Sequence, residues 1–195
     1  MNVPNKLTVS RFALTILFLA VIFSEVPFHE TIALLLFSAG GLTDYFDGMI
    51  ARRDKLITNF GILMDPLADK ILVCSAFIAF VGRGWVPAWM AVIVVARELA
   101  ITGLRLLAAS KNLVLAAEGF GKHKTISQIV AILAILVLHS YWQWGTFGRV
   151  LFGLPAGQPW VGWFTILSLY LAVILTFTSG ALYLWRNRGL YLADL

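Results

Sequence analysis

The chain has little charge and almost no cysteine. Charged residues make up 13% of its 195 residues, and 60% belong to the hydrophobic set. Typical soluble domains carry about 25% charged residues, so this chain has too little polar surface for a water-soluble globule. A single cysteine excludes an internal disulfide. The sequence also lacks long polar linkers, low-complexity segments and clear internal repeats, so we expect one membrane domain over residues 1–195.

Long apolar runs are what the sequence has instead. A membrane-spanning helix needs about 20 largely apolar residues, and six runs of suitable length follow one another along the chain. The sequence therefore predicts an all-α integral membrane protein with six transmembrane helices. The expected spans are 7–24, 31–51, 57–81, 86–109, 125–142 and 161–184.

Lysine and arginine predict the orientation of these spans, because cytoplasmic loops collect them. Six spans put both termini on one side. Of the 15 basic residues, ten fall on that side, while Arg83 and Arg149 fall on the other. Both termini should therefore be cytoplasmic. The net charge of +5 is then explained by the basic residues that collect on the cytoplasmic side. We therefore expect membrane lipids as partners and no nucleic acid.

Charged residues interrupt the second, third and fourth predicted spans. A charge at the bilayer centre costs at least about 2.5–3.5 kcal/mol, so such residues normally face the bundle interior or a wet cavity. One Asp–Arg pair can be a structural ion pair between helices, but four aspartates within residues 44–69 indicate a functional site. The charged residues are Asp44, Asp47, Asp65, Asp69, Lys70, Arg97, Glu98 and Arg105.

The four aspartates are spaced so that they converge. Asp44 and Asp47 are three residues apart, and Asp65 and Asp69 are four apart, so each pair shares a helix face. The basic segment 52–58 joins the two spans as an antiparallel hairpin, which puts both pairs at a similar depth. Four carboxylates cannot all stay ionised and unpaired there. We expect one or two divalent cations between them, and all-oxygen ligands suit Mg²⁺ or Mn²⁺.

These residues also form a recognisable pattern. It reads Asp44-x-x-Asp47-Gly48-x-x-Ala51-Arg52 and, after eight intervening residues, Gly61-x-x-x-Asp65-x-x-x-Asp69. The pattern resembles the signature of the CDP-alcohol phosphotransferase family of membrane enzymes, with every defining position at the expected spacing. The family fold, a six-helix membrane bundle that usually forms a homodimer, agrees with the predicted spans.

The resemblance implies an activity and residue roles. Members cleave the pyrophosphate of a CDP-linked donor and pass its phosphoalcohol part to an acceptor hydroxyl, releasing CMP. By resemblance, Asp44, Asp47 and Asp65 would ligate the metal, and Asp69 would be the general base and also a ligand. The residues that would contact the CDP part of the donor are Gly48, Arg52 and Thr58. Thr58 is also well placed to cap the third span instead.

Three further segments, residues 2–11, 96–105 and 121–128, resemble the bacterial branch of this family that uses CDP-diacylglycerol and glycerol 3-phosphate. The basic residues point the same way, because excess positive charge beside the acidic centre implies a second anion, the acceptor phosphate. The residues expected to bind it are Arg97, Arg105, Lys122 and Lys124. The alternative is that Arg97 pairs with Glu98 or an aspartate, and that the lysines only follow the positive-inside rule.

Other functions remain open at this stage. The same chemistry with inositol 1-phosphate or serine as acceptor would keep the aspartate signature. Membrane prenyltransferases also hold Mg²⁺ with Asp-x-x-Asp motifs, but their second acidic motif lies much further along the chain. A secondary transporter would also carry intramembrane charges, although paired repeats and broken helices are expected there.

Overall fold

The structure is a computed structural model that describes residues 3–53, 59–111, 113, 120–152 and 160–192. Within that part of the chain, all regular structure is helical. The elements are α1 Val3–Ile22, α2 His29–Arg53, α3 Asn59–Gly82, α4 Ala88–Ser110, α5 Phe120–Ser140, the 3₁₀-helix η1 Tyr141–Trp144, α6 Gly145–Phe152, α7 Trp160–Arg186 and α8 Arg188–Leu192.

The six long helices correspond to the six predicted apolar runs, with boundaries within five residues in each case. The all-α class is therefore confirmed. Among the described residues, three segments are long and apolar enough to cross a membrane by length and composition: Asn5–Ile22, His123–Phe152 and Trp160–Arg186. Charged residues lower the hydropathy of α2, α3 and α4. The six-span count and the cytoplasmic termini stay predictions.

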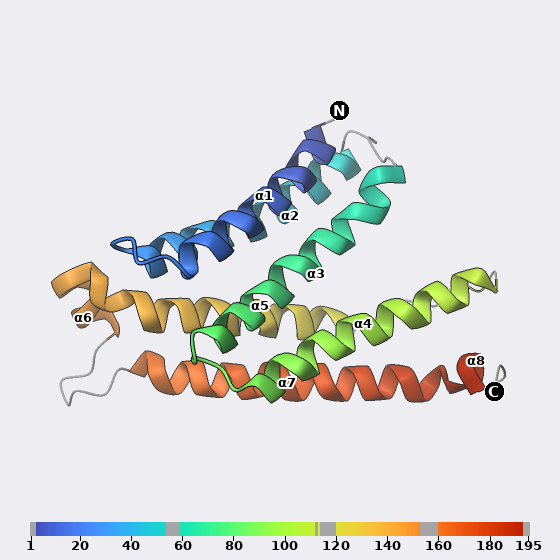
Figure 1. Ribbon diagram of the computed structural model, residues 1–195. Helices are drawn as coiled ribbons and strands as arrows, with labels where there is room; N and C mark the ends of the chain where they lie inside the picture. Colours follow the sequence, from blue (N-terminus) through green and yellow to red (C-terminus); the bar gives the residue numbers. More distant parts are fainter. Residues whose placement is uncertain (1–2, 54–58, 112, 114–119, 153–159, 193–195) are drawn as a thin grey trace.

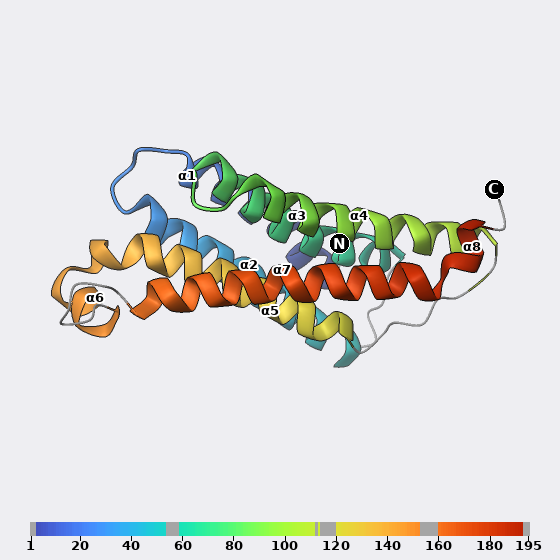
Figure 2. The same ribbon diagram turned by 90° about the horizontal axis from the view of Figure 1, so that it is seen from below.

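The helices form two groups (Figure 1). In one, α1 packs against both α2 and α3; in the other, α7 packs against both α4 and α5. Contacts of α2 with α5 and of α3 with α4 and α5 join the groups. Figure 2 shows α7 running almost the whole length of the molecule beside α4 and α5. The end of α2 and the start of α3 lie together, as expected for an antiparallel hairpin (Figure 1).

An apolar core fills the part of the bundle remote from the aspartates. It is built from apolar side chains of all six long helices, among them Phe18, Phe37, Phe77, Met90 and Ile132. The chain enters α4 through a tight turn in which Gly84 has a φ of +73°, a conformation that glycine adopts without steric cost. Polar and charged residues therefore concentrate toward the other end of α3, α4 and α5, and at the helix ends beside α6.

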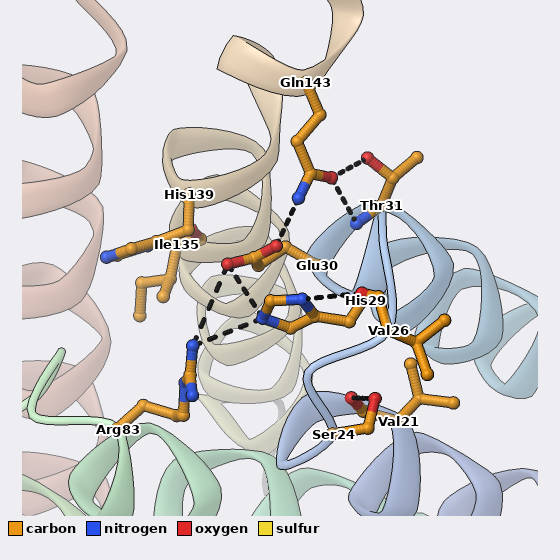
Figure 3. Close-up of polar contacts among 10 residues, drawn as sticks. All are labelled: Val21, Ser24, Val26, His29, Glu30, Thr31, Arg83, Ile135, His139 and Gln143. Carbon is orange, nitrogen blue, oxygen red and sulfur yellow. Dashed lines mark hydrogen bonds and ion pairs between the residues drawn. The ribbon is translucent and has the colours of Figure 1, made fainter.

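A polar network closes the end of the bundle that carries α6 (Figure 3). The Thr31 hydroxyl donates to Gln143 Oε1 at 2.6 Å, and the Gln143 amide donates to Glu30. Glu30 Oε1 lies 3.0 Å from His29 Nε2 and 3.9 Å from Arg83 Nη2. These contacts tie the start of α2 to η1 and to the turn before α4. We call these five residues the α6-end network.

Candidate active site

The signature residues lie where two neighbouring helices approach their connecting segment. Asp44, Asp47, Gly48 and Arg52 fall on the backbone of α2, but their side chains lie outside the described part of the structure. Thr58 falls between α2 and α3, outside the described residues. The convergence of all four carboxylates therefore stays a prediction, and the geometry of the site rests on Asp65 and Asp69 of α3.

Asp65 and Asp69 share one face of α3, and that face meets α1. The Thr8 hydroxyl donates a hydrogen bond to Asp65 Oδ1. Arg11 Nη1 donates to Asp69 Oδ1 at 2.6 Å and forms an ion pair with it. The side chain of Asp69 is nevertheless 44% exposed, whereas that of Arg11 is completely buried. The two carboxylates are thus held from the α1 side while Asp69 remains open on another side.

Thr8 and Arg11 are site neighbours that the sequence analysis missed. Arg11 was counted there as one of the cytoplasmic basic residues, whereas the structure buries its guanidinium between helices. A signal was available, because a threonine and an arginine three residues apart lie on one helix face within the first apolar run. That spacing alone does not reveal which other helix they contact.

A second charged cluster joins α4 and α5 around Glu98. Lys124 Nζ donates to Glu98 Oε1, and Lys124 and Glu98 are both buried. Arg97 Nη1 lies 3.4 Å from the same oxygen. The pairing of Arg97 with Glu98 is the alternative that the sequence left open. Two of the four predicted phosphate-binding residues, Arg97 and Lys124, therefore have a carboxylate partner within the bundle.

Lys70 connects this cluster with α3. Its ammonium donates to the Thr102 hydroxyl of α4 at 2.5 Å, and Thr102 donates in turn to the Glu98 carbonyl at 2.7 Å. Lys70 follows Asp69 directly, and successive helix residues point about 100° apart. Adjacent residues of α3 thus contact different neighbours: Asp69 contacts α1, and Lys70 contacts α4.

Arg97 and Arg105 both turn toward α7. A Cβ atom added to Gly180 would lie 2.7 Å from Arg97 Cγ, so the glycine lets the arginine stem pack directly on α7. Arg105 Nε donates to the Tyr183 hydroxyl at 3.4 Å, and the guanidinium lies 5.8 Å from the ring centroid. Arg97 and Arg105 therefore share the face of α4 that meets α7. The Lys122 side chain lies outside the described part of the structure.

The chemistry of the α3 face fits a hard divalent cation. Carboxylate oxygens are the ligands such cations prefer, and Asp69 is half-open. Among the side chains that the structure describes, no three His, Cys, Asp or Glu residues are close enough to form a metal site. Asp65 and Asp69 would therefore need further ligands. The predicted ones are Asp44 and Asp47, whose side chains the structure does not describe.

Comparison with known proteins adds an independent observation. The model of the family described as CDP-alcohol phosphatidyltransferase matches residues 1–185. A Bacillus subtilis protein named CDP-diacylglycerol–glycerol-3-phosphate 3-phosphatidyltransferase is 37% identical, over 95% of this chain and 95% of its own length. A Salmonella paratyphi A protein of the same name is 31% identical over 96% of both chains. A Mycobacterium tuberculosis protein named probable phosphatidylglycerophosphate synthase is 38% identical over 67% of this chain.

Proposed function

The chain belongs to the CDP-alcohol phosphatidyltransferase family, and from that premise we propose that it transfers the phosphatidyl group of CDP-diacylglycerol to glycerol 3-phosphate. The products are phosphatidylglycerol phosphate and CMP. The observation that carries the choice of acceptor is the similarity, over 95% of the chain, to a protein named for this reaction. The basic residues Arg97 and Arg105 on the α7-facing side of α4 support it, because a phosphorylated acceptor needs cationic partners.

The reaction is a displacement at phosphorus. The acceptor hydroxyl forms a bond to the phosphorus that carries diacylglycerol, and the bond from that phosphorus to the CMP oxygen breaks. Phosphoryl transfer depends mainly on positioning and charge stabilisation. Mg²⁺ or Mn²⁺ held by Asp44, Asp47, Asp65 and Asp69 would neutralise the pyrophosphate charge. Asp69 accepts the hydroxyl proton, a role that its half-open carboxylate permits.

The other residues bind and orient the substrates. Gly48, Arg52 and Thr58 contact the CDP part of the donor. Arg105, steadied by Tyr183, and Lys122 bind the acceptor phosphate. Arg97 and Lys124 contribute to the same positive region, although Glu98 offsets part of their charge.

We further propose that residues 1–195 form a single domain that crosses the bacterial inner membrane six times. The active site faces the cytoplasm, where CDP-diacylglycerol presents its water-soluble head. Two copies form a homodimer, as the family resemblance implies.

The test is turnover by the purified protein with CDP-diacylglycerol and Mg²⁺. CMP release and the lipid product are measured with glycerol 3-phosphate, inositol 1-phosphate or serine as acceptor. Glycerol 3-phosphate should be preferred strongly, and EDTA should stop the reaction. Comparable turnover with either of the other acceptors would overturn the acceptor assignment.

The matched variant is Asp69→Asn, which keeps the shape of the side chain and removes its charge. It should abolish transfer while the protein stays folded, as judged by its elution volume and helical circular dichroism. Full activity of this variant would remove Asp69 as the general base.

A further inference from the structure

Two side chains of α1 each contact one of the two signature aspartates whose side chains the structure describes. Thr8 and Arg11 are each 0% exposed, and they lie three residues apart on one face of the helix. Their partners, Asp65 and Asp69, lie four apart on α3. Thr8 contacts Oδ1 of Asp65 and Arg11 contacts Oδ1 of Asp69. The contacts pair the two helices residue for residue, and each uses one oxygen of its carboxylate.

The two contacts differ in chemistry. A threonine hydroxyl adds a directed hydrogen bond and no charge, so it fixes the rotation of a carboxylate. An arginine adds a permanent positive charge as well as its hydrogen bond. The Arg11 guanidinium is buried and the Asp69 carboxylate is half-open. The arginine therefore reaches the aspartate from within the bundle and leaves part of the carboxylate accessible.

The buried arginine balances part of the negative charge of the acidic site. Acidic groups collected within a membrane domain repel each other when no cation lies between them. A buried positive charge on a neighbouring helix offsets that repulsion without occupying the open side of the site. Partners that orient ligand side chains also tune metal affinity.

We propose that α1 prepares the acidic site for its divalent cation: Thr8 is a positioning residue that orients Asp65 for metal binding, and Arg11 is the countercharge that stabilises Asp69 while no cation is bound. The inference rests on the proposed function in one respect, that Asp65 and Asp69 are metal ligands. It assigns α1 a role in the site that is separate from substrate recognition.

The test for Thr8 uses Mn²⁺ alone, with no substrate. Thr8→Val preserves the shape of the side chain and removes its hydroxyl. The dissociation constant of Mn²⁺ from the purified protein, followed by electron paramagnetic resonance of the free ion, should rise about 10- to 100-fold. Thr8→Ser should restore the affinity. The matched control is Thr15→Val, because Thr15 is also buried on α1 but bonds to the Arg11 carbonyl of its own helix.

Equal Mn²⁺ affinity in Thr8→Val and the unaltered protein would overturn the role of Thr8. So would an equal loss in Thr8→Val and Thr15→Val, because that result would indicate general damage to α1.

The test for Arg11 compares unfolding in EDTA with unfolding in saturating Mn²⁺. Arg11→Met should lower the midpoint in EDTA by more than the midpoint in Mn²⁺, because the bound cation replaces the lost charge. In EDTA, the unfolding midpoint of Arg11→Lys, which keeps the charge, should lie between those of Arg11→Met and the unaltered protein. In EDTA, Asp69→Asn combined with Arg11→Met should be more stable than Arg11→Met alone, since neither charge then lacks its partner.

If Arg11→Met lowers the unfolding midpoint equally with and without Mn²⁺, and Asp69→Asn does not restore stability in EDTA, Arg11 only packs between helices. That result would overturn its role as a countercharge. None of these measurements requires turnover. A chain that binds Mn²⁺ as described but does not use glycerol 3-phosphate would contradict the proposed function alone. If the enzyme is active with glycerol 3-phosphate, but the Thr8 variants keep their Mn²⁺ affinity and the Arg11 variants lose equal stability with and without Mn²⁺, this inference alone would be contradicted.

Discussion

Glu98 is the residue on which the cations of α4 and α5 depend. Its carboxylate contacts both Lys124 and Arg97, and it is 7% exposed. Buried ion pairs add little net stability compared with apolar packing, but removing one partner leaves an uncompensated buried charge. The cluster is therefore more sensitive to loss of the shared anion than to loss of either cation.

We expect Glu98→Gln to destabilise the protein by about 3–5 kcal/mol, because two cations lose their common partner. Chemical unfolding followed by tryptophan fluorescence measures the change. Glu25→Gln serves as the control, because Glu25 is an exposed acid of the same type. A similar small effect in both variants would show that the Glu98 contacts contribute little.

Tyr183 should affect acceptor binding through Arg105. Tyr183→Phe keeps the ring beneath the guanidinium but removes the hydroxyl that accepts from Nε. A net hydrogen bond of this kind contributes about 0.5–1.5 kcal/mol. The KM for glycerol 3-phosphate should therefore rise about 2- to 10-fold, with the KM for CDP-diacylglycerol unchanged. Steady-state kinetics measures both constants.

Tyr191→Phe is the control for that variant, because the Tyr191 hydroxyl bonds to the Leu184 carbonyl. An equal rise of the two KM values in Tyr183→Phe would mean that Arg105 does not act on the acceptor specifically.

At the scale of elements, the sequence predicts the long helices well and the contacts between them poorly. Apolar runs of fixed length locate each helix, and the spacing of Asp65 and Asp69 gives their shared face. The partners of that face, Thr8 and Arg11, come from more than 50 positions earlier in the chain. No local spacing encodes which helix packs against which, because that choice depends on the whole bundle.

The short elements show the same limit. η1, α6 and α8 escaped the sequence analysis because they are only 4, 8 and 5 residues long, too short for a helical period to stand out. Their positions follow from tertiary contacts. Thr31 of α2 accepts a hydrogen bond from the Trp144 indole at 3.0 Å, so η1 is held partly by a helix that precedes it by about a hundred residues.

The α6-end network should stabilise the bundle without affecting catalysis. Gln143→Leu removes the Gln143 partner of the Thr31 amide and of Glu30 Oε2, although Glu30 Oε1 keeps His29 and Arg83. Each unsatisfied buried group of this kind costs about 1–3 kcal/mol. We expect a lower unfolding midpoint and faster hydrogen exchange at the start of α2. The values of kcat and both KM should stay unchanged, because the aspartates lie toward the other end of α2 and α3. A marked change in kcat would contradict this separation.

At the scale of the molecule, stability and chemistry occupy different parts of the same helices. The apolar core takes the α6 end of α3 and the adjoining parts of its neighbours. The acidic face, Lys70 and the Glu98 cluster take the rest of α3 and the facing parts of α1, α4 and α5. A membrane enzyme whose lipid donor carries a water-soluble nucleotide head needs this polarity, because its charged site must open toward one aqueous side.

The orientation of the whole bundle is the remaining prediction, and the sole cysteine makes it testable. Cys74→Ala provides a cysteine-free background. A cysteine is then introduced by Arg149→Cys, on α6, or by Ser110→Cys, at the last residue of α4, and both positions are exposed. Because basic residues collect on the cytoplasmic side, a membrane-impermeant maleimide should label the Arg149→Cys protein in right-side-out vesicles. It should label the Ser110→Cys protein only in inverted vesicles. The reverse pattern would place the acidic site on the outer face, away from cytoplasmic glycerol 3-phosphate. Labelling of both proteins from one side would contradict the crossing of the membrane between α4 and α6.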